Sequence, residues 1–564
     1  MNFKHEIAKL IAAAANLDVK DIEQALEIPP ESEMGDFAFP CFRLAKEMRQ
    51  APPAIAENIR AKIDTPAFLD KVVTTGPYLN FFVNRGYYAK AALSVITDKG
   101  ARFGSSDIGS GDCVVIDYSA PNVAKPFHIG HLRSTVIGHA LYNIYGFLGY
   151  KPFSINYIGD WGTQFGKIIT AYEHWGVDEE IHAEGITALL KLYVKFHEEA
   201  DKNPTYDEEA RSWFVKMEQG DEYALKLWKW FFDVSMDEYK KIYTMLDIDF
   251  DSYDGESFYN DKMMPVVEEM KEKNILVESD GAMIVDLEDY KMPPCLILRR
   301  DGGTLYPTRD IASIMYRKKE YNFVKAIYVT GHEQMLHFAQ WFKVVELMGY
   351  EWAKDQLVHV PFGLINFAQG KLSTRKGNVI LMEKFLNDAI ARIGEIIENK
   401  NPDLKNKKEV AHQVGIGAVI FNDLYNNRIK DIEFSWDRML NFDGETGPYV
   451  QYTHARCNSV LNKANADFSS ADASKLTEDE EFELIKALYA FPDKVIEAAN
   501  KYEPFIVSRY VMQVAQAYNK FYHNNRILQA DEDIKLARLL LTKCTKDVIC
   551  TGLGLLGIKS PEEM

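Results

Sequence analysis

The chain has 564 residues, of which 47% are hydrophobic and 26% charged, and its formal net charge at pH 7 is −18; such values are ordinary for a soluble globular protein of several domains. No apolar run approaches the roughly 18 residues that a membrane-spanning helix needs, and the N-terminus lacks a secretory signal pattern, so we expect a cytoplasmic protein without a membrane partner. Six scattered cysteines without a CxxC pair argue against a structural zinc site and against a disulfide framework.

The N-terminal part of the chain, residues 1–108, alternates helical patterns with short strand-like runs such as 78-YLNFFVN-84. It ends in a linker rich in Gly and Ser at 104–112. This pattern predicts a small α+β domain.

A strand–helix rhythm begins at 113-CVVIDYS-119, where a β-branched run is followed by a loop and by a helix from about His128. A strand-like run at 151–160 and a helix from about Thr163 repeat the rhythm. Such alternation predicts a parallel sheet, and ligands of these sheets bind at the carboxyl ends of the strands.

The middle of the chain adds a long helical stretch to this sheet domain. Residues 178–275 are charged and helical in pattern, which indicates an insertion. Strand-like runs return at 281–287, 295–300 and 324–330.

The C-terminal part is helical in pattern from about residue 410 onward. Thr477 and Glu480 have the spacing of a capping box at the start of a helix. Residues 501–546 hold eight Lys and Arg against four Asp and Glu, interleaved with aromatic rings. Lys and Arg interleaved with aromatic side chains are typical of surfaces that bind single-stranded RNA. Packing in the core of a helical bundle nevertheless explains most of these aromatic side chains better.

Together these elements predict an α/β, multidomain fold. An α+β N-terminal domain (1–108) precedes a Rossmann-like parallel-sheet domain (109–440) that carries the helical insertion, and an all-α C-terminal bundle (441–564) follows.

The stretch 115-VIDYSAPNVAKPFHIGHLRSTVIGHAL-141 places polar residues between a strand and a helix. A helix N-terminus presents free N–H groups and a positive dipole end, which suit phosphates. His128 and His131 are three residues apart and share one face, where both can donate hydrogen bonds to phosphate oxygens. Gly130 leaves room for a flat purine against the backbone, and Lys125 adds a positive charge beside the same pocket.

The letters HIGH at 128–131 match the first signature of class I aminoacyl-tRNA synthetases, and the longer string SAPNVAKPFHIGHLRSTVIG resembles arginyl-tRNA synthetases. Three further blocks agree in order and spacing. GDWGTQFG at 159–166 looks like the family's second strand-to-helix turn. 304-TLYPTRDIA-312 looks like its strand carrying substrate-pocket residues, and 369-QGKLSTRKGNVI-380 looks like its mobile KMSKS loop. The similarity covers essentially the whole chain.

The resemblance implies catalytic roles for residues of this loop and of the HIGH region. His128, His131 and Lys125 would act on the ATP phosphates, together with Lys371 and Lys376, of which one is the counterpart of the loop lysine that contacts pyrophosphate. ATP binding would also involve Gly130 and Ser373.

The family activates arginine with ATP and passes the arginyl group to the terminal adenosine of its tRNA, so the resemblance implies ATP with Mg²⁺, L-arginine and tRNA(Arg) as partners. Selecting arginine requires acids, because a fixed carboxylate meets a guanidinium with paired hydrogen bonds. Asp310, four residues after Tyr306, is the first candidate and Glu256 the second. By resemblance, Asn122 and Gln334 hold the amino and carboxyl end of arginine.

The same resemblance implies an anticodon-binding role for the C-terminal bundle, a tRNA-contacting role for the N-terminal domain, and a monomer. Three alternatives remain. A class I enzyme for glutamate or glutamine would need a basic or an amide-reading pocket. A small nucleotidylyltransferase that shares HIGH would lack the C-terminal bundle. A non-catalytic tRNA-binding paralogue usually loses the HIGH histidines or the loop lysines.

Overall fold

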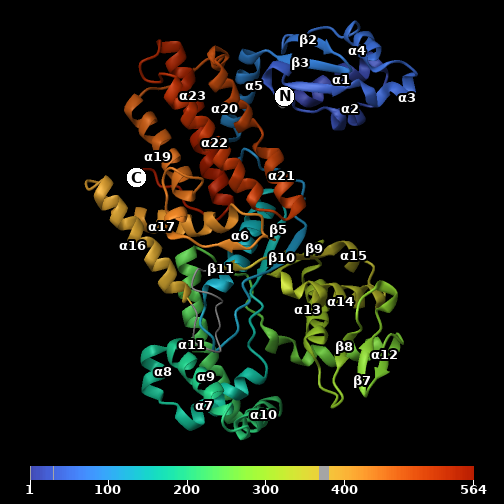
Figure 1. The fold of residues 1–564 in the computed structure, drawn as a ribbon, viewed down its shortest axis with the longest axis vertical. Coiled ribbons are helices and arrows are strands. Elements are labelled where there is room, and N and C mark those ends of the chain that lie inside the picture. Colours follow the sequence, from blue (N-terminus) through green and yellow to red (C-terminus); the bar gives the residue numbers. More distant parts are fainter. Residues whose placement is uncertain (1, 30, 367–379) are drawn as a thin grey trace. The chain divides into compact units, whose positions relative to one another are not determined.

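The computed structural model describes residues 2–29, 31–366 and 380–564, which form helices and four sheets (Figure 1). Contacts divide the chain into two compact units. The first comprises Met1–Phe103, Arg456–Phe491 and Gln513–Val548, and the second comprises Gly104–Ala455, Pro492–Met512 and Ile549–Met564. The predicted α/β, multidomain class is confirmed.

The N-terminal part of the first unit contains a three-stranded antiparallel sheet in the order β1-β3-β2. The predicted strand at 78–84 is its central strand, in which Leu79 and Phe81 are fully buried. Burial of alternate apolar side chains on one face stabilises such a sheet. Its elements are α1 (Phe3–Ala15), α2 (Val19–Ala25), β1 (Phe37–Pro40), α3 (Ala45–Met48), α4 (Pro52–Arg60), β2 (Leu69–Thr75), β3 (Tyr78–Val83) and α5 (Arg85–Lys99).

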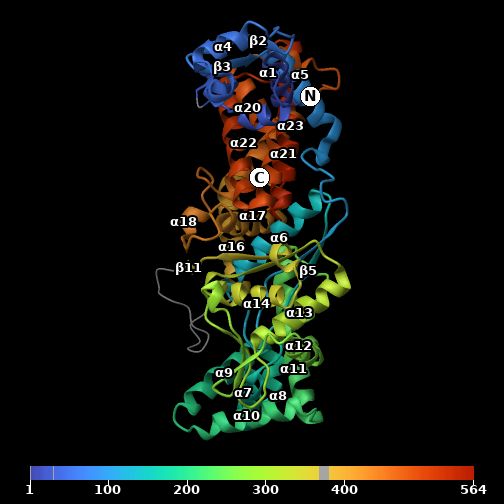
Figure 2. The same ribbon diagram turned by 90° about the vertical axis from the view of Figure 1, so that its right-hand side faces the viewer.

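Long helices make up the C-terminal part of the chain, and Figures 1 and 2 show α20, α22 and α23 running side by side. Tyr510, Tyr518 and Phe521 are buried in this bundle, whereas Tyr522 is 38% exposed. Three of the six Phe and Tyr rings between 501 and 546 are therefore core residues, and Tyr502 and Phe505 are partly buried. The helices are α19 (Gly447–Ala464), α20 (Asp479–Tyr489), α21 (Phe491–Lys501), α22 (Phe505–Asn524) and α23 (Glu532–Leu555).

A four-stranded parallel sheet in the order β10-β9-β4-β5 forms the centre of the second unit. The chain passes from β4 to β5 on one side and later returns to β9 on the other side of β4, so the carboxyl ends of β4 and β9 flank a topological switch point. The sheet and its helices are β4 (Cys113–Asp117), α6 (Leu132–Phe147), β5 (Lys151–Ile155), α7 (Thr163–Trp175), α13 (Tyr306–Tyr321), β9 (Lys325–Gly331), α14 (Met335–Leu347), α15 (Ala353–Gln356) and β10 (Leu357–Phe362).

The apolar spacing in the first helix of this sheet is confirmed. Leu132, Val136, Ala140 and Ile144 are all buried, at 3% exposure or less. Residues four apart lie on one face of a helix, so these side chains cover the sheet together.

The predicted insertion is helical through most of its length. It contains α8 (Asp178–Glu184), α9 (Ile186–Ala200), α10 (Thr205–Glu218), α11 (Glu222–Leu246), the 3₁₀ segment η5 (Glu256–Lys262) and α12 (Met263–Glu272). After it, β6 (Val277–Ser279), β7 (Ala282–Val285) and β8 (Cys295–Leu298) form a separate antiparallel sheet. Of the three strand-like runs that follow the insertion, only 324–330 therefore enters the parallel sheet.

Two expectations about elements need correction. The segment 304–312 is not a strand, because helix α13 begins at Tyr306 with Pro307 in its first turn, where the fixed φ of proline favours a helix start. The region beyond 410 is not wholly helical, since β12 (Ile432–Glu433) pairs with β11 (Ile365–Asn366). The helices before and after β12 in the chain are α16 (Met382–Lys400), α17 (Lys407–Leu424) and α18 (Trp436–Met439).

Within the described ranges, no helix is both long and apolar enough to cross a membrane.

Candidate functional site

A cavity of about 370 Å³ lies at the carboxyl ends of β4 and β9. It occupies the switch point of the parallel sheet, where open α/β sheets bind ligands. The five residues predicted to bind one small molecule all line this cavity: Asn122, Glu256, Tyr306, Asp310 and Gln334. The fold therefore brings together side chains that span 213 positions of the sequence, from 122 to 334 counted inclusively.

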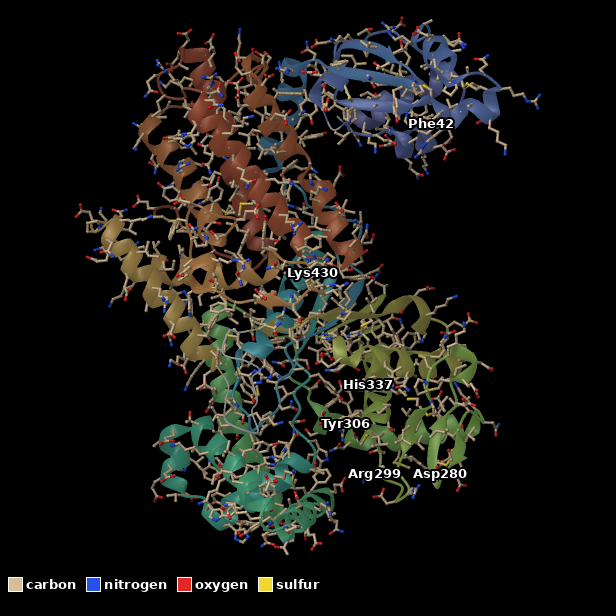
Figure 3. The ribbon with its side chains drawn as sticks, in the orientation of Figure 1. Phe42, Asp280, Arg299, Tyr306, His337 and Lys430 are labelled. Carbon is tan, nitrogen blue, oxygen red and sulfur yellow. The ribbon has the colours of Figure 1, made fainter. Side chains whose placement is uncertain are left out.

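Helix α13 positions two of these side chains. Tyr306 is its first residue and Asp310 lies one turn later, so both face the cavity. Figure 3 shows Tyr306 near His337, a residue of α14 that also lines the cavity. Thr308 stabilises this helix start, because its hydroxyl donates a hydrogen bond to the backbone oxygen of Ile297 over 2.5 Å.

The cavity is acidic. Asp117, Glu256 and Asp310 line it, and its described lining contains neither Lys nor Arg. Burial raises the pKa of Glu256 to about 7, against the opposing charge of Arg309. Burial likewise raises the pKa of Asp117 to about 6, against Arg317. Removing a carboxylate from water disfavours its charged form, so a cationic ligand would relieve the cost of ionising both acids.

Each of the three acids has a basic neighbour. Arg317 Nη1 lies 2.7 Å from Asp117 Oδ2, and both side chains are almost wholly buried. Arg309 Nη1 lies 3.5 Å from Glu256 Oε2.

The third neighbour is an imidazole. His337 Nε2 lies 2.6 Å from Asp310 Oδ2. The imidazole differs from the two guanidinium groups because its charge depends on pH.

Backbone contacts hold the loop that carries Asn122 at the cavity. The Val123 amide donates to the Gly159 oxygen (3.1 Å), and the Gly159 amide donates to the Pro121 oxygen (3.0 Å). A Cβ at position 159 would lie 2.2 Å from Asn122 Oδ1. Gly159, the first residue of the 159–166 block, is therefore required for this arrangement of the Asn122 side chain.

The two histidines of the HIGH turn are close, with ring centroids 4.1 Å apart. The Gly130 amide donates to His128 Nδ1 (3.0 Å), and the His128 amide donates to His131 Nδ1 (3.2 Å). A neutral imidazole whose Nδ1 accepts a hydrogen bond carries its proton on Nε2. Both rings therefore retain an Nε2–H group as a donor.

Both rings are neutral at pH 7. Burial, aided by the nearby charge of Lys125, lowers the pKa of His128 to about 4. Burial, aided by His128, holds the pKa of His131 well below its ordinary value. Lys125 Nζ lies 5.5 Å from the centre of the Tyr193 ring, on helix α9 of the insertion.

Gly130 was expected to leave its backbone open to a purine, but the ring of His128 lies beside it. A Cβ at this position would lie 2.7 Å from Cε1 of His128. The absence of a side chain at Gly130 thus leaves room for the imidazole ring of His128.

The second predicted signature, with Lys371, Ser373 and Lys376, lies outside the described residues. The chain that follows it contacts the HIGH turn, because the Ile129 amide donates to the Ile380 oxygen and the Met382 amide donates to the Phe127 oxygen, both over 3.0 Å.

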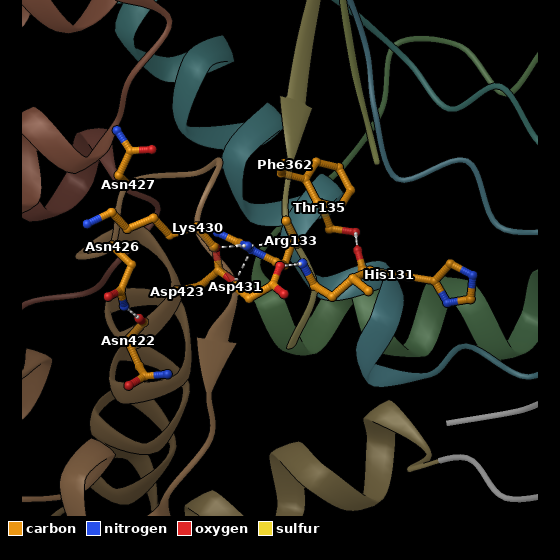
Figure 4. A network of polar contacts seen from close by, with 12 residues as sticks. His131, Arg133, Thr135, Phe362, Asn422, Asp423, Asn426, Asn427, Lys430 and Asp431 are labelled. Atoms are coloured by element: carbon orange, nitrogen blue, oxygen red, sulfur yellow. Dashed lines mark hydrogen bonds and ion pairs between the residues drawn. The ribbon is translucent and has the colours of Figure 1, made fainter. Parts of the chain in front are cut away.

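A buried ion pair anchors the helix that begins at the HIGH turn (Figure 4). Arg133 Nε lies 3.1 Å from Asp423 Oδ2, with side-chain exposures of 1% and 2%. Arg133 Nη1 also donates to the backbone oxygens of Gly363 (2.9 Å) and Lys430 (2.8 Å). One side chain thus joins α6 to α17 and to the segments beside β11 and β12.

Sequence reasoning missed Asp117 and His337 as cavity residues. Asp117 ends the predicted strand 113–119, and an acid at the carboxyl end of a parallel strand was a usable signal. His337 lies 27 residues after Asp310 in an ordinary amphipathic helix, and no local pattern connects the two.

Three family models match the chain. The catalytic domain of class I (R) tRNA synthetases matches residues 94–436, the DALR anticodon binding domain matches 450–564, and the arginyl tRNA synthetase N terminal domain matches 1–83.

Curated relatives are similar over the full length. The arginine–tRNA ligases of Alkaliphilus metalliredigens and Halothermothrix orenii are each 55% identical to this chain, and that of Clostridium perfringens is 53% identical; each match covers 100% of both chains.

Solved structures share the fold. The arginyl-tRNA synthetase of Thermus thermophilus superimposes with a TM-score of 0.83 at 24% identity, covering 100% of both chains. That of Plasmodium falciparum gives 0.80 at 22% identity, covering 99% of this chain and 98% of its own. From the catalytic-domain match and the full-length identity to curated relatives, the chain belongs to the arginine–tRNA ligase family of class I aminoacyl-tRNA synthetases.

Proposed function

We propose that the chain activates L-arginine with ATP to form arginyl-adenylate and transfers the arginyl group to the 3′-terminal adenosine of tRNA(Arg). The observation that supports this proposal most directly is the charge of the cavity at the sheet switch point. Its described lining holds three carboxyl groups and no Lys or Arg. A guanidinium satisfies such a lining with paired, charge-assisted hydrogen bonds, whereas glutamate would be repelled and glutamine would bring no positive charge to the acids.

In this proposal arginine lies across the cavity. Its guanidinium meets Asp310, with Glu256 and Asp117 nearby, and Tyr306 covers its side chain. Asn122 and Gln334 hold the amino and carboxyl end. Asn122 belongs to the loop that continues into the HIGH turn, so the carboxylate of arginine would face the ATP site.

Adenylate formation needs alignment and charge neutralisation. An oxygen of the arginine carboxylate bonds to the α-phosphorus of ATP, the bond from that phosphorus to the β-phosphate oxygen breaks, and pyrophosphate leaves. The Nε2–H groups of His128 and His131 donate to phosphate oxygens as charge develops. Lys125 and one of Lys371 and Lys376 supply positive charge, and the HIGH turn with Gly130 and Ser373 contacts ATP.

Mg²⁺ would enter with ATP. Among the described residues, no group of three or more His, Cys, Asp or Glu side chains could hold a metal ion. The ion would therefore be held by the phosphates, whose charge it would neutralise.

The tRNA-binding surface would include a second hollow, of about 280 Å³, in the first unit. It is lined by Arg456, Lys463 and Arg526 together with Tyr522 and His523. The Arg456 guanidinium lies 5.2 Å from the centre of the Tyr522 ring. Exposed aromatic side chains beside Lys and Arg side chains suit the unstacked nucleotides of an RNA loop.

The proposed division of labour follows three domains. Residues 1–108 contact the body of the tRNA, 109–440 with the insertion at 178–275 carry out catalysis, and 441–564 bind the anticodon. The enzyme acts as a monomer in the cytoplasm, a reducing compartment that suits its six scattered cysteines.

The test is ATP–pyrophosphate exchange with each of the twenty amino acids, with and without total tRNA. Exchange with arginine alone is the expected result. Exchange with glutamate or glutamine instead would overturn the assignment of the acidic cavity. Absence of exchange under both conditions would indicate a non-catalytic tRNA-binding protein.

A further inference from the structure

The three acids of the cavity differ in whether their basic neighbour carries a permanent charge. Arg317 and Arg309, the partners of Asp117 and Glu256, keep their charge at any physiological pH. Neither arginine is among the described lining of the cavity. Asp310 is paired instead with His337, which lines the cavity itself.

A neutral His337 leaves the charge of Asp310 available to a ligand. Nε2–H then donates to Oδ2 over 2.6 Å, which fixes the plane of the carboxylate and leaves its second oxygen for a guanidinium. Asp117 and Glu256 share their charge with permanent cations, so Asp310 is the cavity acid whose negative charge depends on the state of an imidazole.

A protonated His337 acts in the opposite way. It keeps the same hydrogen bond but places a positive charge beside Asp310, inside the cavity. That charge neutralises the carboxylate and repels a second cation at the same acid. Protonation of His337 and binding of a guanidinium therefore oppose each other, and by linkage each weakens the other equally.

We propose that His337 is a positioning residue of the arginine subsite: its neutral form orients Asp310 toward the substrate guanidinium, and its protonated form competes with arginine. The inference rests on the proposed function, because it takes arginine as the ligand of this cavity. It adds a residue that senses pH and tunes specificity for a cation.

Other titratable groups face His337 and must be separated from it. Glu256 from η5, Asp117 from β4, and Tyr306 from α13 line the same cavity. His359 of β10 is a further imidazole nearby; burial, followed by the charges of Arg428 and His337, lowers its pKa to about 4. Arg309 and Arg317 lie behind the acids.

The test compares KM for arginine and KM for ATP between pH 5.5 and 8.5 in tRNA-supported pyrophosphate exchange. In the wild-type chain, KM for arginine is expected to rise as pH falls, because the carboxyls of Glu256 and Asp117, whose pKa burial raises, gain protons and because a positive charge on His337 would oppose arginine at Asp310. His337→Gln keeps an amide donor and cannot gain a proton. It is expected to reduce the number of protons coupled to arginine binding by one, with KM for arginine at pH 8.5 within about threefold of wild type.

A fixed charge supplies the complementary variant. His337→Lys is expected to raise KM for arginine at least about tenfold even at pH 8.5, since the repulsion no longer depends on protonation, with KM for ATP unchanged. His332→Gln is the matched control, because His332 is an exposed imidazole near the same strand end that does not line the cavity; it should retain the wild-type pH profile.

The outcomes separate this inference from the proposed function. A His337→Gln variant with the full wild-type proton coupling, or a His337→Lys variant with a normal KM for arginine, would overturn the role of His337 while arginine remained the substrate. A wild-type chain that fails to exchange with arginine at pH 8.5 would overturn both. A merely structural role would raise the KM of both substrates at every pH, which also contradicts the proposal.

Discussion

Asp310 illustrates how one side chain can set specificity. It lies one helical turn after Tyr306, its Oδ2 contacts His337 Nε2, and its side chain lines the cavity. Under the proposed function, charge and geometry together would select a guanidinium here, since a carboxylate accepts its paired donors in one plane.

Asp310→Ala is expected to raise KM for arginine by about 100-fold or more, because the lost charge-assisted hydrogen bonds are worth about 3 kcal/mol or more in total. KM for ATP should change less than about threefold, since ATP would bind at the HIGH turn. Steady-state exchange with each substrate varied in turn measures both constants. Asp289→Ala, at an exposed acid outside the cavity, is the control; equal effects of Asp310→Ala on both substrates would contradict the pocket assignment.

The hydrogen-bond pattern of His128 permits a test of which ring nitrogen acts. Its Nδ1 already accepts from the Gly130 amide, so Nε2–H is the group available to phosphate. The amide nitrogen of Gln can approach the Nε2 position, whereas that of Asn matches Nδ1. His128→Asn is therefore expected to lower the rate of adenylate formation by about 10²–10³, the usual cost of one transition-state donor.

His128→Gln should retain at least about tenfold more activity than His128→Asn in a single-turnover measurement of adenylate formation. Arginine KM should be similar in both variants. If the Asn variant proved the more active of the two, the Nδ1 atom would be the donor and the hydrogen-bond pattern of the turn would change when ATP binds.

At the scale of elements, the structure places two features slightly differently from their predicted position or type. The predicted capping box of Thr477 and Glu480 is formed by the next pair, Glu478 and Glu481, before helix α20. The block 304–312 is a helix start and not a strand, yet the one-turn spacing of Tyr306 and Asp310 still places both in the cavity. The spacing of four residues between the two side chains therefore corresponds to one turn of a helix and not to a strand.

The Arg133–Asp423 pair holds three elements near the HIGH turn, and it is almost wholly buried. Asp423→Ala is expected to reduce the free energy of unfolding of the catalytic unit by about 3–5 kcal/mol, because it leaves a buried guanidinium without its partner. Chemical denaturation followed by tryptophan fluorescence measures the loss.

The exposed pair Lys229–Asp233 is the matched control. Asp233→Ala should cost less than about 1 kcal/mol, as is usual for surface ion pairs. A loss below about 1 kcal/mol for Asp423→Ala as well would mean that Arg133 finds other acceptors, and its two carbonyl partners are the candidates.

At the scale of the whole molecule, a net charge of −18 coexists with a proposed polyanionic partner. Local charge decides such binding, because salt screens charges beyond about 10 Å at 0.1 M ionic strength. Around Tyr522, three bases and a histidine line one hollow.

Lys463→Ala and Arg526→Ala are each expected to weaken tRNA binding and to reduce the slope of log K against log salt by about one, if each contacts one phosphate. Filter binding or fluorescence titration at several salt concentrations measures this slope. Tyr522→Ala should weaken binding by about 1–3 kcal/mol with the slope unchanged, since stacking releases no counterions. Unchanged slopes for both basic variants would place the tRNA elsewhere.

The sequence by itself determined the class of fold and pointed to five of the residues that line the cavity. Local patterns identified β4, β5 and β9 and the buried face of α6, but β10 was not predicted. The family resemblance and the chemistry of guanidinium recognition indicated five residues that all line the cavity at the switch point of the sheet: Asn122, Glu256, Tyr306, Asp310 and Gln334. The strand and helix predictions were confirmed because burial and parallel topology impose strong, local patterns on a chain, whereas the binding roles of the cavity residues stay predictions.

Only the tertiary structure decided which acids of the cavity have permanent partners. Asp117 meets Arg317 across 200 positions, and Asp310 meets His337 across 27. No local pattern encodes such pairs, because they depend on how strands and helices pack. The same holds for the neutral state of His128 and His131, which follows from burial and from amide donors of the folded turn. Chemistry that arises from proximity and desolvation is absent from the linear chain until the fold supplies both.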